Sequence, residues 1–119
     1  MNVNFPVVEL VDRWAISCVK LSRTGKSSEY EFYDQQLQKF DVTSIQKPLD
    51  DLVGIHNKIW ELEKELKSGK EQNLSLEEIG RRAILIRDFN NKRILLKNQM
   101  ADILGHDGVR EFKKDHLSQ

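Results

Sequence analysis

Residues 90–99 of the chain read NNKRILLKNQ and place polar side chains in line with a run of apolar ones. Asn90, Arg93 and Lys97 are spaced three and four residues apart, so a helix would carry them on one face together with Met100 and Leu104. An ionised side chain taken out of water without a partner costs several kcal/mol. These three residues are therefore expected to meet opposite charges, water or a ligand.

Two other stretches repeat this arrangement at the border of an apolar face. His56, Trp60 and Glu63 are spaced four and three residues apart, and Asp12 and Lys20 are eight apart. We expect all these side chains to meet between three helices. The candidate binding site predicted from the sequence consists of Asp12, Lys20, His56, Trp60, Glu63, Asn90, Arg93 and Lys97.

The charges of this set favour an anionic ligand. Three cations, Lys20, Arg93 and Lys97, face two carboxylates, Asp12 and Glu63. Arginine can offer two parallel N–H groups to a phosphate or carboxylate, and lysine offers a point charge. In the ligand interpretation Arg93 and Lys97 bind the anion, and the two acids hold the cations in place. In the alternative interpretation the cluster is purely structural, with Glu63 paired to Arg93 and Asp12 to Lys97.

The sequence indicates no catalytic residue, no metal and no cofactor. Cys18 lies on an apolar helical stripe, where a thiol is expected to pack in the core. Glu61, Glu63 and Glu65 are two residues apart and spread around a helix, which argues against an all-α Mg²⁺-dependent nucleotide pyrophosphatase. A likeness to small helical chorismate mutases is limited to the basic stretch, which here lies near the end of the chain rather than at its start. Both enzyme classes stay as alternatives.

Apolar residues recur every three to four positions, and no alternation of period two is sustained, so the predicted fold is an all-α antiparallel bundle of about four helices. The first helix is expected over 6–23, and the third over 49–67 after a connection that ends at Pro48. Capping-box spacings, Ser28 with Glu31 and Ser75 with Glu78, predict the starts of the second helix and of a long fourth helix that ends at Leu104.

The composition predicts one domain over residues 1–105 and a polar, disordered tail over 106–119. Nineteen basic residues balance nineteen acidic ones, so neither nucleic acid nor an anionic membrane is an expected partner. No apolar run approaches the ~20 residues of a membrane span, no basic start of a signal peptide is present, and the single cysteine excludes an internal disulfide. We therefore expect a cytoplasmic protein. Ile84, Ile94 and Leu95 lie off the main apolar stripe and predict the surface of a homodimer.

Three blocks of the sequence carry a family resemblance: ELVDRWAISCVK (9–20), HNKIWELEKE (56–65) and NNKRILLKNQMADILG (90–105). Together they resemble small all-helical bacterial proteins grouped as domains of unknown function, which are often encoded near polysaccharide glycosyltransferases. The chain departs from that pattern where His56 replaces an asparagine and Lys64 an acid, which puts a metal site built on paired acids in doubt. The resemblance implies an accessory role in polysaccharide biosynthesis. The residues that match are Asp12, Arg13, Lys20, Trp60, Glu63, Asn90, Arg93, Lys97 and Gly105.

Overall fold

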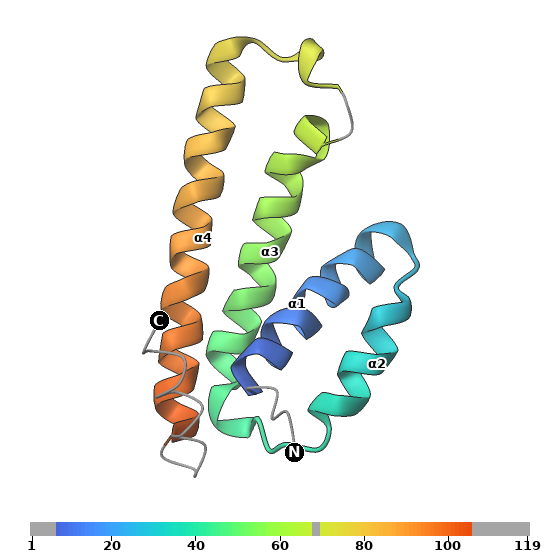
Figure 1. Ribbon diagram of the computed structural model, residues 1–119, viewed down its shortest axis with the longest axis vertical. Helices are drawn as coiled ribbons and strands as arrows, with labels where there is room; N and C mark the ends of the chain where they lie inside the picture. The colour runs from blue at the N-terminus through green and yellow to red at the C-terminus, as the bar shows by residue number, and fades with distance from the viewer. Residues whose placement is uncertain (1–6, 68–69, 106–119) are drawn as a thin grey trace, which may run out of the picture.

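The computed structural model describes residues 7–67 and 70–105, and within these ranges it contains α-helices and 3₁₀ turns but no strand. The predicted all-α fold is confirmed. In Figure 1 the long helices α3 and α4 run antiparallel side by side, α1 packs against both, and α2 packs against α1. The elements are α1 (Val7–Thr24), α2 (Ser28–Leu37), η1 (Thr43–Ile45), α3 (Gln46–Lys67), η2 (Glu71–Asn73) and α4 (Leu76–Leu104).

The helix starts test the predicted capping residues. Ser75 caps α4 as predicted, because its hydroxyl accepts the backbone N–H of Glu78 at 3.0 Å. The prediction for α2 was wrong by one residue. Ser27, whose backbone is extended, accepts the N–H of Tyr30 at 3.2 Å, so Ser28 is already the first helical residue. A capping residue needs extended backbone angles, which Ser27 has. The spacing of Ser28 and Glu31 in the sequence does not show which serine adopts these angles.

Pro48 does not separate a connection from α3, contrary to prediction. The helix begins at Gln46, so the proline lies in its first turn. A proline is tolerated there because the first N–H groups of a helix have no partner within the helix. The turn Thr43–Ile45 leads directly into α3, and Ile45 is fully buried at this junction. The predicted tail over 106–119 lies outside the described residues.

The core is concentrated at one end of the bundle. It combines the first turns of α1 and α3 with the last turns of α4, where Val11, Leu52 and Met100 are all fully buried. Cys18, predicted to be core, is only half-buried. It lies on the side of α1 that faces α2, where Trp14 donates its indole N–H to Asp34 at 3.1 Å. The pairing of α1 with α2 therefore uses a different stripe of α1 from the main core.

At the opposite end of the bundle, the described residues belong to α3, α4 and the short turn η2 between them. At 1.5 Å per residue α4 is about 43 Å long and α1 about 27 Å, so α1 covers only part of the longer helix. Figure 1 shows the upper parts of α3 and α4 extending past the α1–α2 pair. The buried residues of α4 all lie in its last two turns. A recess consequently forms where α1 diverges from the two long helices.

No helix within the described residues is both long and apolar enough to cross a membrane.

Candidate functional site

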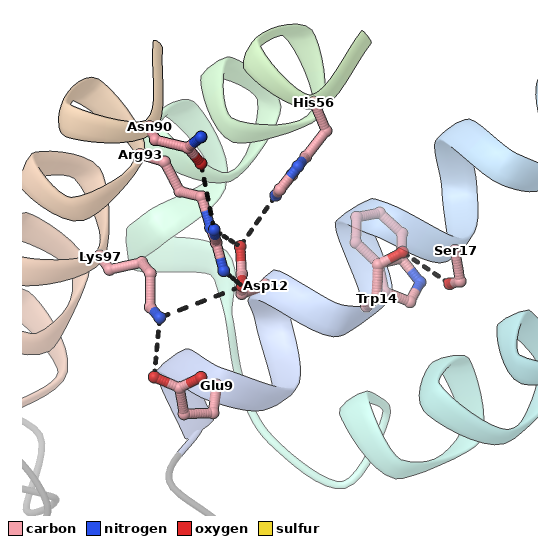
Figure 2. Close-up of polar contacts among 8 residues, drawn as sticks. All are labelled: Glu9, Asp12, Trp14, Ser17, His56, Asn90, Arg93 and Lys97. Carbon is pink, nitrogen blue, oxygen red and sulfur yellow. Dashed lines mark hydrogen bonds and ion pairs between the residues drawn. The ribbon is translucent and has the colours of Figure 1, made fainter. Parts of the chain in front are cut away.

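Asp12 is at the centre of the predicted polar cluster. It lies on the inner face of α1 and is only 2% exposed. From α4, Arg93 donates Nε to one carboxylate oxygen of Asp12 at 3.1 Å and Nη2 to the other at 2.7 Å. From α3, Nε2 of His56 lies 2.9 Å from the first oxygen. Figure 2 shows these side chains converging on Asp12 from the three helices, as the sequence predicts.

These partners keep Asp12 ionised. Burial raises the pKa of its carboxyl, but the hydrogen bonds from His56 and Arg93 outweigh burial and lower that pKa to about 2. An ionised carboxylate only accepts hydrogen bonds, so Nε2 of His56 carries the proton of this contact. The hydrogen bonds that Arg93 donates to Asp12 raise the pKa of Arg93. The three side chains form a closed network in which the carboxylate has donors on both oxygens.

Lys97 and Asn90 extend this network along α4. Lys97 Nζ pairs with Glu9 Oε2 at 2.8 Å and lies 4.0 Å from the nearer Asp12 oxygen. The predicted Asp12–Lys97 contact is thus present, but it is longer than the contact with Glu9. Asn90 Oδ1 accepts Nη1 of Arg93 at 3.3 Å, which fixes the guanidinium from its other side. The partner predicted for Arg93 was Glu63, whereas its bidentate ion pair is with Asp12.

Lys20 lies away from the cluster. Eight residues after Asp12 it is turned about 80° around α1 and displaced roughly 12 Å along it, so it points towards α2. Its Nζ pairs with Glu29 at 3.2 Å, and both side chains are about half exposed. It lines a separate, smaller recess of about 220 Å³ between α1 and α2, together with Arg13 and Tyr33. The expectation that Lys20 joins the three-helix cluster is wrong.

A groove of about 390 Å³ opens directly beside the Asp12 network, between α1, α3 and α4. This volume is within the range of about 300–1,000 Å³ that is typical of small-molecule sites. Its wall combines apolar side chains from α1 and α3 with polar ones from α3 and α4. The lining residues are Ile16, Val19, His56, Ile59, Trp60, Glu63, Asn90 and Arg93. Five of the eight residues predicted as the site therefore share one groove.

The groove has mixed polarity and no excess of positive charge. Arg93 is 31% exposed at the side chain and lines the groove, while its guanidinium donates to Asp12 and Asn90. The structure removes Lys20 from the predicted set and adds Glu9, which changes the expected balance of positive and negative charges. The cluster and groove then contain the cations Arg93 and Lys97 with the carboxylates Glu9, Asp12 and Glu63, besides His56. A doubly charged anion would gain little from this field, whereas a singly charged group could pair with the partly exposed Arg93.

Neither nucleophilic nor metal chemistry finds support in this arrangement. Burial, with a smaller contribution from Asp34, raises the pKa of Cys18 to about 11, and a thiol in that state is a poor nucleophile. No group of three or more His, Cys, Asp or Glu side chains is placed to hold a metal ion within residues 7–67 and 70–105. His56 is 8% exposed and hydrogen-bonded to Asp12, so its ring is held in one orientation.

Sequence reasoning missed Glu9 as a member of the cluster. It lies three residues before Asp12, one turn of α1 towards the N-terminus, and its carboxylate takes the ion pair expected for Asp12. The spacing of three could have revealed it, since residues three apart share a helix face. Ile16 and Val19 were also missed as groove walls. Apolar residues that line a groove cannot be distinguished by type from those that fill a core.

Comparisons with protein-family models, with curated proteins and with solved structures found no match to this chain. The resemblance to small bacterial helical domains therefore stays a prediction, and the groove is the feature that points to a function.

Proposed function

We propose that the protein is a small helical binding module whose ligand occupies the groove between α1, α3 and α4. The observation that carries this proposal is that Trp60, Glu63, Asn90 and Arg93 line a single groove of about 390 Å³. Such a groove, with apolar walls and a few convergent polar groups, has the features expected of a small-molecule site.

The chemistry of the wall defines the ligand class. Trp60 and Ile59 offer an apolar surface for a planar or aliphatic body, and Arg93, which is 31% exposed at the side chain, can donate to an anionic group. Glu63 in the same wall would repel a dianion. A monoanion, such as a carboxylate or a phosphodiester, fits this balance better than free phosphate, and Glu63 and Asn90 can hydrogen-bond to hydroxyl groups of the same ligand. The sugar nucleotides that the family resemblance suggests carry two negative charges on their diphosphate, so this balance of charges favours them less than a monoanion.

A thermal-shift and calorimetric screen against carboxylic acids, phosphate, nucleotides and sugar nucleotides tests this function. A ligand present at 100 times its Kd should stabilise the protein by about 2.7 kcal/mol. The diagnostic variant is Asn90→Asp, which keeps an oxygen that accepts from Arg93 but adds a negative charge to the groove. The matched control is Asn91→Asp, whose side chain is exposed on another face of α4.

Binding that is lost in Asn90→Asp and retained in Asn91→Asp would locate the ligand in the groove. A ligand whose affinity is the same in both variants binds elsewhere and contradicts the proposal. If no compound shifts the melting temperature, the structural interpretation is favoured, in which the Asp12 network only fixes the positions of the three helices.

A second candidate function is that of a protein-interaction module that self-associates. It is favoured by the exposed apolar side chains of Ile84, Ile94 and Leu95 on α4, which are 52%, 54% and 67% exposed. Ile84 and Leu95 share one face of the helix, and Ile94 lies about 80–100° around the helix from them. Exposed apolar residues that lie close together commonly mark an interface. Sedimentation or light scattering over a range of concentrations tests it, because a self-associating protein gains mass as its concentration rises.

A further inference from the structure

On the outer face of α4, apolar and polar residues follow one another in an order that is the same in both directions along the helix. Ile84, Asp88, Asn91 and Leu95 follow one another at intervals of four, three and four, so they share one face of the helix. All four are exposed. Along this face, an apolar residue stands at each end and two polar residues stand in the middle. The ligand groove is approached by the opposite side of α4, which carries Arg93.

This order is self-complementary when two copies of α4 pack antiparallel. In such a pair, residues at equal distances from the middle of the contact oppose each other. Ile84 and Leu95 are equally far from the point between residues 89 and 90, and so are Asp88 and Asn91. Each Ile84 would therefore meet the second copy's Leu95, twice in the dimer, and each Asp88 would meet an asparagine amide that can donate to it.

The charges beside this face agree with the same register. Lys92 lies on the same flank of the helix as Asp88, four residues away. In the antiparallel pair, the Asp88 carboxylate of one copy comes to the level of the second copy's Lys92. A parallel pair would instead place each Asp88 opposite another Asp88, which like charges disfavour. The residues on the outer face of α4 therefore fit a second copy in the antiparallel orientation.

We propose that the protein forms a two-fold symmetric dimer through the outer face of α4, with the two helices antiparallel and Ile84 packed against the second copy's Leu95. This inference rests on self-association, the second candidate function above. The matching segment, residues 84–95, is about 17 Å long. That is short compared with interfaces of about 800 Å² per partner, so the dimer dissociates on dilution.

Disulfide cross-linking tests the register. In a Cys18→Ala background, Ile84→Cys and Leu95→Cys are combined in one chain and oxidised. The expected result is a covalent dimer, because each cysteine then opposes its counterpart on the second copy. Either single variant should cross-link at least ten-fold more slowly, because two copies of residue 84 lie roughly 17 Å apart, beyond the ~7 Å between Cα atoms that a disulfide spans. Ile84→Cys with Leu76→Cys is the control, since Leu76 is 87% exposed but out of register.

Mass measurement separates the register from self-association itself. Sedimentation should show a dimer that Leu95→Asp converts to a monomer with unchanged helix content. A dimer that cross-links as fast through a single cysteine as through the pair overturns the antiparallel register but leaves self-association intact. A monomer at every concentration overturns both. Ligand binding in the groove is expected to be unchanged in Leu95→Asp, because the groove lies on the other side of α4.

Discussion

Replacing Arg93 with methionine tests whether the Asp12 network is buried. The variant removes both hydrogen bonds of Arg93 to Asp12, at 3.1 and 2.7 Å, and leaves the carboxylate 2% exposed with His56 as its remaining short contact. Hydrogen bonds to a charged group each contribute about 1.5–3 kcal/mol, and breaking a buried ion pair costs about 3–5 kcal/mol. Lys97, 4.0 Å from the carboxylate, offsets part of this loss. We expect a loss of about 3 kcal/mol in the free energy of unfolding.

Urea denaturation followed by far-UV circular dichroism measures this loss, with an unchanged m-value as the sign that only stability has changed. The control is Lys20→Met, which removes the exposed ion pair with Glu29 and should cost less than about 1 kcal/mol. The double variant Asp12→Asn with Arg93→Met should be more stable than Arg93→Met alone, because it no longer buries an unpaired charge. A cost below about 1 kcal/mol for Arg93→Met would refute the reasoning and indicate a solvated Asp12.

Three further predictions concern the pH dependence, a cap and the core. The carboxyl of Asp12 has a pKa of about 2 in the folded protein and an ordinary pKa of 3.8, so its ionised form adds about 2 kcal/mol of stability above pH ~4, and this stability is lost as the pH falls through ~2. Acid unfolding of Asp12→Asn should lack this component. Ser75→Ala removes the hydroxyl that accepts from Glu78 and should cost about 1 kcal/mol in urea denaturation. Leu52→Ala, at a fully buried position, should cost about 2–5 kcal/mol, whereas Leu76→Ala should change stability by less than about 0.5 kcal/mol in the same assay.

Local signals made part of the fold predictable. The cap at Ser75 and the end of α4 at Leu104 depend on residues within one or two turns, and both are confirmed. Pro48 was misread because proline restricts helices in general yet is tolerated in a first turn, and only the preceding turn Thr43–Ile45 shows where that first turn lies. Sequence patterns within one or two turns therefore predict where the helices lie better than they predict the residue at which each helix begins.

The candidate site was predictable to the level of helix faces. His56, Trp60 and Glu63 share a face because of their spacing alone, and the structure places all three along the groove. The choice of ion-pair partners was not predictable, because it depends on how far α1 is shifted along α4 when they pack. That shift brings Asp12 level with Arg93 and Glu9 level with Lys97. A helical wheel shows which residues of one helix share a face, but it contains no information about the shift of α1 along α4.

The position of the Asp12 network bears on why it exists. A buried ion pair is often no more stabilising than apolar residues of the same volume, so packing alone gives little reason for a charged network here. The network lies where the buried core ends and the groove begins, and it holds the Arg93 guanidinium between Asp12 and Asn90 beside that groove. A guanidinium fixed in this way loses less conformational entropy on binding a ligand than a free one. Under the proposed binding function, the cost of burying Asp12 is understandable as preorganisation of the groove.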